Sequence, residues 1–129
     1  MDYVIEFQDS GGPADVEIAL SGVLNSADFR RLTKSLSADP RFRAGLSMLV
    51  DVSDLDTSGV TPAHLQDLSE PIIERDWTQP PRAVAIVAAG SQTLAAARAY
   101  RASLGGSKSN RQVFTSRAEA LAWLDSDAP

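Results

Sequence analysis

Two segments dense in apolar residues constrain the fold most strongly, because segments of this kind are typical of strands that are covered on both faces. They are Leu46–Val52 and Ala83–Ala88. Strands buried on both faces occur mainly in parallel sheets, where helices cover the two sides. Between the two runs, Thr61-Pro62 predicts a helix start, since threonine caps helices well and proline suits the first helical position. We therefore expect strands and helices to alternate around a parallel sheet.

The N-terminal region predicts two strands of a different kind. Apolar and polar residues alternate along Tyr3–Phe7 and again along Val16–Leu20, and a period of two is typical of strands with one face on a core. Turn-forming residues rich in glycine separate the two segments. We expect an antiparallel hairpin near one edge of the sheet, followed by a helix that Asn25 or Ser26 caps and that ends near Ala38.

Three further helices and a short strand complete the expected order. The first of these helices begins at Pro62, the second covers Gln92 to about Leu104, and the third begins after Ser116. The segment Arg111–Phe114 predicts a short edge strand between the last two helices. Each helix is thus expected to carry the chain from one parallel strand to the next or to close the sequence.

The fold class predicted from this order is α/β, with a mixed sheet and the element order β-β-α-β-α-β-α-β-α. The antiparallel hairpin comes first and is followed by parallel strands with helical crossovers. At 129 residues the chain is expected to form a single domain over residues 1–129. Pro71 lies inside the helix that begins at Pro62 and lacks a backbone donor, so we expect a kink or an early end there.

Composition excludes several classes of site. The chain has no cysteine and one histidine, so it offers no thiol nucleophile and no ligand set for structural zinc. The net charge is −5, which argues against nonspecific binding to nucleic acid. The charge is also uneven: residues 77–118 hold six basic residues and no acidic ones, so they sum to +6 and the remainder to −11.

No segment of the sequence has the length and hydrophobicity of a membrane-spanning helix. The start, Met1–Glu6, lacks the basic and apolar regions of a secretory signal. A cytoplasmic location is therefore the default expectation.

The order of several short segments resembles the STAS domain, and more narrowly the SpoIIAA-like subgroup of small bacterial proteins similar to anti-sigma factor antagonists. The segments run through most of the chain. They are Gly22-Val-Leu24, Asp39-Pro-Arg-Phe42, Leu49-Val-Asp-Val52, Thr61-Pro62, Pro81–Val87, Arg98-Ala-Tyr100, Val113-Phe114 and Glu119–Leu124. The resemblance implies a SpoIIAA-like mixed sheet and a non-enzymatic binding or regulatory role.

In the antagonists, a loop of the form Asp-Ser-Ser-Gly follows a strand, and the start of the next helix carries the serine or threonine that is phosphorylated. Here Asp56-Thr-Ser-Gly59 matches the letters of that loop, whereas the helix cap is Thr61. The resemblance therefore leaves two candidate phosphorylation sites, Ser58 and Thr61. A phosphate near a helix N-terminus would meet free N–H groups and a favourable dipole.

Catalytic interpretations depend on the loop Asp54–Gly59. Its carboxylates predict, as a further alternative, a small hydrolase, and Ser58 with His64 and an aspartate would supply a triad. A Gly-x-Ser-x-Gly elbow is absent from the sequence, and a loop-bracing role for His64 is the simpler interpretation. We expect no enzymatic activity, no metal site and no cofactor.

The basic residues of the second half form a candidate docking surface. Arg98 and Arg101 lie one turn apart on the expected helix, and Lys108 and Arg111 follow in the loop beyond. Such a surface suits an acidic partner or a second copy of the chain. The leading hypothesis is a binding or regulatory module that recognises a partner protein or a small apolar or anionic ligand and forms a homodimer.

Overall fold

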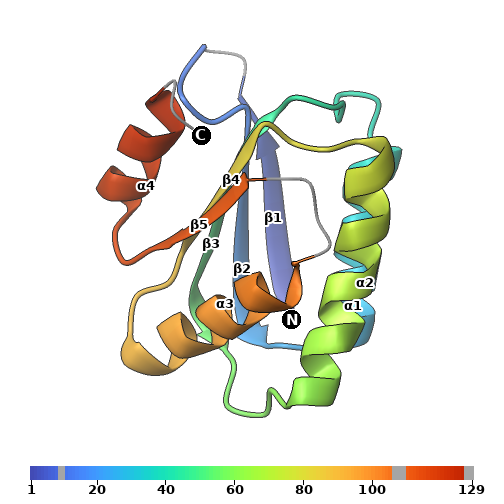
Figure 1. Ribbon diagram of the computed structural model, residues 1–129, viewed down its shortest axis with the longest axis vertical. Helices are drawn as coiled ribbons and strands as arrows, with labels where there is room; N and C mark the ends of the chain where they lie inside the picture. The colour runs from blue at the N-terminus through green and yellow to red at the C-terminus, as the bar shows by residue number, and fades with distance from the viewer. Residues whose placement is uncertain (9–10, 106–109, 127–129) are drawn as a thin grey trace.

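The computed structural model describes residues 1–8, 11–105 and 110–126. Five strands and four helices alternate in the predicted order (Figure 1). They are β1 (Asp2–Phe7), β2 (Val16–Val23), α1 (Ser26–Ala38), β3 (Ser47–Asp56), α2 (Pro62–Thr78), β4 (Ala83–Val87), α3 (Ser91–Ser103), β5 (Asn110–Phe114) and α4 (Arg117–Asp125).

The five strands form one sheet in the order β1-β2-β3-β4-β5. The β1–β2 pair is antiparallel, and every later pair is parallel. The sequence prediction of an N-terminal hairpin at one edge, followed by parallel strands, is therefore confirmed. All five residues of β4 are buried, as its unbroken apolar sequence predicted.

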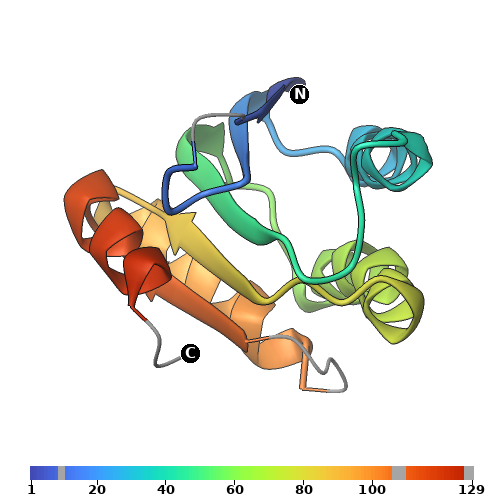
Figure 2. The same cartoon turned by 90° about the horizontal axis from the view of Figure 1, so that it is seen from above.

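The helices cover the two faces of the sheet unequally. Figure 2 shows α4 on one side of the sheet and α1 and α2 on the other. Leu32 and Leu36 of α1 and Ala97 of α3 join one core cluster with the strands, whereas Ala120 and Leu124 of α4 join a second, smaller cluster on the opposite face. The larger core cluster thus lies between the sheet and helices α1 and α3.

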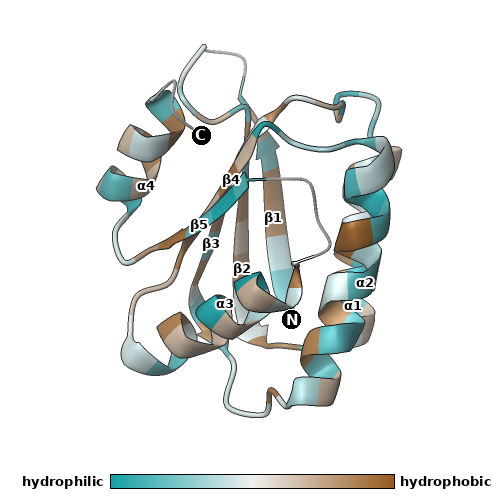
Figure 3. Ribbon diagram, viewed as in Figure 1, coloured by the Kyte–Doolittle hydropathy of each residue, from teal (hydrophilic) through white to brown (hydrophobic). Residues whose placement is uncertain are grey.

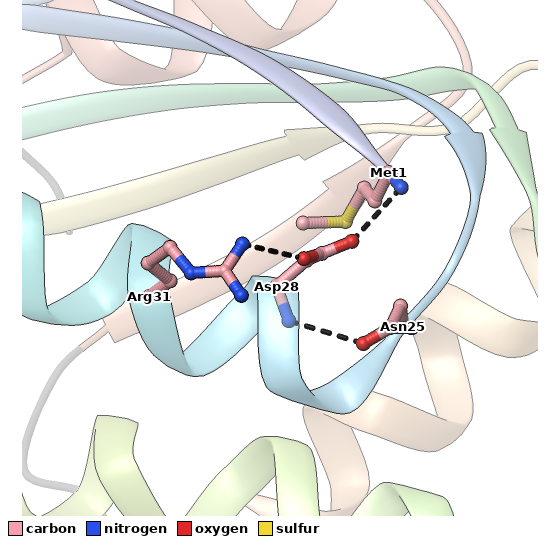
Figure 4. A network of polar contacts seen from close by, with 4 residues as sticks. All are labelled: Met1, Asn25, Asp28 and Arg31. Atoms are coloured by element: carbon pink, nitrogen blue, oxygen red, sulfur yellow. Dashed lines mark hydrogen bonds and ion pairs between the residues drawn. The ribbon is translucent and has the colours of Figure 1, made fainter.

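The chain start is tied to the first turn of α1. The Met1 amino group lies 3.0 Å from Asp28 Oδ2, and Arg31 Nη1 donates to Asp28 Oδ1 at 2.8 Å (Figure 4). Asn25 caps the same helix, since its side chain accepts a hydrogen bond from the Asp28 N–H. These contacts fix the edge strand β1 to α1 and so close one side of the larger core.

Strand β3 is longer than the sequence predicted. The expectation was a strand ending at Val52 and a polar loop after it, but the strand continues to Asp56. Its last three residues pair with Ser21, Gly22 and Val23 of β2 after a register shift. The physical reason is the alternation in this stretch: Leu55 is buried, while its neighbours Asp54 and Asp56 are exposed.

Helix α2 passes through Pro71 and continues to Thr78, so the expected early end is wrong. The carbonyl that loses its partner belongs to Asp67, which is exposed and can bond to water. Hydrophilic and hydrophobic segments alternate along this helix (Figure 3). Its buried side holds Leu68 and Ile72, as the sequence pattern predicted.

Candidate functional site

A cavity of about 110 Å³ lies between the sheet and helices α1, α2 and α3. Its walls are almost entirely apolar. The apolar side chains that line it are Ile18, Leu20, Leu24, Phe29, Leu32, Leu36, Met48, Val50, Val52, Leu55, Val60, Leu65, Leu68, Ile72, Val84, Ile86, Ala96 and Ala97. A space of this kind favours an apolar occupant, because apolar cavities of similar size stay dry and bind small hydrophobic molecules.

One end of the cavity carries a buried hydroxyl group. Thr57 follows β3 directly and is 9% exposed, and its Oγ1 has no hydrogen-bond partner among the described residues. Leaving a buried hydroxyl unpaired costs free energy. The unpaired hydroxyl is therefore available to a polar atom of an occupant.

A buried charge cluster lies at the other end, where α2 ends and β5 begins. Asp76 is 1% exposed and accepts two hydrogen bonds from Arg111, Nη1 to Oδ2 at 2.6 Å and Nη2 to Oδ1 at 3.3 Å. Arg75 lies on the other side of this carboxylate, with its Nε 3.9 Å from Asp76 Oδ1. Two guanidinium groups therefore share one buried carboxylate.

Arg75 lies beside an aromatic ring, and its Nε is not satisfied there. Its guanidinium stacks over the Phe42 ring at 5.2 Å from the centroid, and its buried Nε has no hydrogen-bond partner among the described residues. Burial lowers the pKa of Arg75, since desolvation disfavours the charged form. Tyr100, which also lines the cavity, has a pKa raised to about 12 by burial of its phenol.

The turn before α2 holds both candidate phosphorylation sites. Ser58 and Thr61 are both exposed. Thr61 is the N-cap of α2, and its Oγ1 accepts a hydrogen bond from the His64 N–H at 3.3 Å. The Ser58 N–H donates to Asp56 Oδ1 at 2.9 Å, and hydrogen bonds from Ser58 lower the pKa of the Asp56 carboxyl. Thr61 is thus the residue at the helix N-cap, and Ser58 lies in the turn just before it.

His64 braces this turn. Its Nδ1 lies 3.3 Å from the Thr61 nitrogen and 3.1 Å from the Gly59 carbonyl oxygen, so the ring accepts from the first or donates to the second according to its tautomer. No hydrogen bond joins the Ser58 side chain to His64 within the described ranges 1–8, 11–105 and 110–126. The hydrolase alternative also loses part of its loop, because Asp54 and Asp56 lie on β3.

The four residues of the candidate docking surface are not equivalent. Arg98 and Arg101 are exposed on α3, and the Arg101 Nε donates to the Arg111 carbonyl oxygen at 2.7 Å. Arg111 is 6% exposed, so its expected place on the surface is wrong: the side chain turns inward because Asp76 offers it a buried counter-charge. Lys108 lies outside the described residues. For Arg98 and Arg101, docking stays a prediction.

Arg75 and Asp76 were missed by sequence reasoning, although a signal was present. Leu65, Leu68 and Ile72 mark the inward stripe of α2, and the next positions on that stripe, three and four residues after Ile72, are Arg75 and Asp76. Charged residues at core positions indicate a buried ion pair or a polar site. The partner is Arg111, which lies near the start of an edge strand and forms the ion pair with Asp76.

Two kinds of site receive no support from the part of the chain that the structure describes. It contains no group of three or more His, Asp or Glu side chains placed to hold a metal ion. None of its helices combines the length and hydrophobicity needed to cross a bilayer.

Comparisons with known proteins bear on the fold. No protein-family model matches the chain, and no curated protein matches it. A search of solved structures finds the crystal structure of an uncharacterized protein from the DUF3478 family with a SpoIIAA-like fold, from Shewanella loihica PV-4. The two share 21% sequence identity with a TM-score of 0.62, over 95% of this chain and 92% of the other. The chain therefore has a SpoIIAA-like fold, as the resemblance in its sequence implied.

Proposed function

We propose that this SpoIIAA-like chain is a non-enzymatic binding module that takes a small, mainly apolar ligand into the cavity under α2 and α3. The observation that carries the proposal is the cavity itself, about 110 Å³ with apolar walls. Its volume is somewhat below the about 150 Å³ at which an engineered apolar cavity binds benzene. A ligand of about four to six carbon atoms suits this space.

Binding of a probe tests the proposal. We expect hexan-1-ol to shift the methyl resonances of core residues such as Ile86 and Leu68 in an NMR titration, because both side chains line the cavity. Ala97→Leu should abolish the shifts, since Ala97 is buried, lines the cavity and would fill it with three further carbon atoms. Ala99→Leu is the matched control, because Ala99 is exposed on the same helix. Absence of binding to the unmodified protein would remove the proposal.

A regulatory reading is the second candidate, favoured by the exposure of Ser58 and Thr61 next to the cavity. Val60 and Leu65 line the cavity on either side of Thr61, so a phosphate on this turn would alter one wall. In this proposal the phosphate changes which partner the module binds. Exposed Arg98 and Arg101 support a protein partner or a second copy of the chain as the binding target.

A further inference from the structure

Arg75 is the least satisfied charged group among the described residues of the core. It is 8% exposed and lines the cavity. A guanidinium carries five N–H donors. The buried Nε of Arg75 has no hydrogen-bond partner among the described residues, and the one carboxylate neighbour stays 3.9 Å from it. Buried charges in proteins are ordinarily paired and hydrogen-bonded, because desolvating an unpaired one is costly.

The neighbouring ion pair leaves Arg75 in this state. Both carboxylate oxygens of Asp76 are engaged by Arg111, at 2.6 Å and 3.3 Å. Among the described residues at this end of the cavity, the guanidinium groups of Arg75 and Arg111 share the one carboxylate of Asp76. The Phe42 ring covers one face of the Arg75 guanidinium at 5.2 Å, which holds the group in place beside the cavity while the buried Nε has no partner among the described residues.

We propose that Arg75 binds the carboxylate of a short aliphatic monocarboxylate whose tail lies in the cavity. The inference rests on the proposed function, since it assigns the chemical class of the ligand at that same site. A planar guanidinium matches the two oxygens of a carboxylate with two parallel hydrogen bonds. A ligand carboxylate would also place a negative charge beside the guanidinium that shares Asp76 with Arg111. The apolar cavity of about 110 Å³ accepts a tail of about four to six carbon atoms.

The test compares two probes that differ only in the head group, hexanoate and hexan-1-ol, by NMR titration at neutral pH. We expect the protein to bind hexanoate about tenfold or more tightly than hexan-1-ol, the increment of a charge-assisted hydrogen-bonded pair. Arg75→Met keeps the volume and removes the charge, so it should cost hexanoate that advantage and leave hexan-1-ol within about twofold. Arg43→Met is the control, because Arg43 is exposed in the loop before β3 and does not line the cavity, so this change should leave both affinities unchanged.

Two further variants keep the outcome interpretable. Arg75→Lys retains the positive charge but lacks the paired N–H donors of a guanidinium. It should lose only part of the preference for hexanoate over hexan-1-ol, which tests the inference even if Arg75→Met folds poorly. Ala97→Leu should block hexanoate, because the tail needs the cavity; hexanoate that still binds this variant occupies the surface and overturns the inference. Equal affinity for the two probes also overturns it while the proposed function stands. Binding of neither probe removes the proposed function as well.

Discussion

Asp76 is the residue on which the polar end of the cavity depends. It is almost fully buried, and it faces guanidinium groups on α2 and β5 that would otherwise repel each other across an apolar interior. Taking such charges out of water is expensive, and their mutual attraction offsets the cost only while every partner is present. A change at this one carboxylate therefore affects the ion pair that joins α2 to β5.

Asp76→Asn should lower the free energy of unfolding by about 3–5 kcal/mol, because it removes the carboxylate charge that two buried guanidiniums share. Urea denaturation followed by circular dichroism measures the loss. Asp67→Asn provides the control on the same helix, since Asp67 is exposed, and it should stay within about 0.5 kcal/mol of the unmodified protein. Equal stability of the two variants would contradict a structural role for the Asp76 carboxylate.

Asp28 is expected to account for part of the loss of folding stability at acidic pH. Its hydrogen bond with the Met1 amino group, together with the charges of that amine and of Arg31, lowers the pKa of Asp28 from 3.8. A carboxyl whose pKa is lower in the folded state contributes stability above its unfolded pKa and loses it as the pH falls through the folded value. The contribution should thus be present at neutral pH, decline once the pH falls below about 4, and be lost as the pH falls through the lowered pKa of Asp28.

Asp28→Asn should consequently flatten the acid limb of the stability profile. Urea midpoints measured between about pH 7 and pH 3 test this, and the difference between the variant and the unmodified protein should shrink as the pH falls. The control is Asp125→Asn, at the exposed end of α4, which makes no described ion pair. A constant difference across the pH range would show that the effect of Asp28 is not electrostatic.

At the scale of elements, α2 joins the candidate regulatory turn to the cavity. Its N-cap is Thr61, and its inward side supplies Leu65, Leu68, Ile72 and Arg75 to the cavity wall. The helix therefore connects two sites that lie at opposite ends of its 17 residues. A change in its N-terminal turn can therefore reach the residues that line the cavity.

Substitutions in that turn separate capping from phosphorylation. Thr61→Ala should cost about 1 kcal/mol of stability because it removes the N-cap, Thr61→Ser should restore most of it, and Ser58→Ala should be nearly neutral. Intact-mass analysis after incubation with a serine/threonine kinase then tests modification of the two sites. Phosphate addition that Ser58→Ala prevents assigns Ser58, and addition that Thr61→Ala prevents assigns Thr61. No added phosphate in the unmodified protein would exclude the regulatory candidate for that kinase.

Much of the element order could be predicted because it depends on local signals. Helix starts at Asn25, Thr61 and Ser116 have side chains that accept backbone hydrogen bonds in the way their capping chemistry predicts. The end of β3 could not be predicted by the same reasoning. The polar residues in this stretch suggest a loop. Only the pairing with β2 shows that it is a strand, in which buried Leu55 alternates with exposed carboxylates.

The candidate site was less predictable than the fold, because its residues meet only in space. Asp76 and Arg111 lie 35 positions apart, and their pairing depends on how α2 crosses to β5. The sequence alone placed Arg111 with exposed Arg98 and Arg101, since all belong to one basic region. Long-range pairing of a buried counter-charge overrides such regional composition.

At the scale of the whole molecule, charge is divided between two parts of the sheet. Strands β1, β2 and β3 contain no lysine or arginine and carry the carboxylates Asp2, Glu6, Glu17, Asp51, Asp54 and Asp56. Arg98 and Arg101 are exposed on α3, beside β5 at the opposite edge. Opposite charges on separate surfaces steer association between molecules and make it sensitive to salt.

Self-association should therefore depend on Arg98. Sedimentation velocity at low ionic strength should detect dimers of the unmodified protein, and Arg98→Glu should weaken them because it places a negative charge on the basic surface. Raising the salt to about 0.5 M should have a similar effect, since the screening length falls below 10 Å. Arg43→Glu is the matched control, because Arg43 is exposed in the loop before β3 and lies away from α3 in the chain. A monomer at every concentration would contradict the homodimer, and a different protein would then be the expected partner of the basic surface. Dimers that resist both salt and Arg98→Glu would place the interface elsewhere on the molecule.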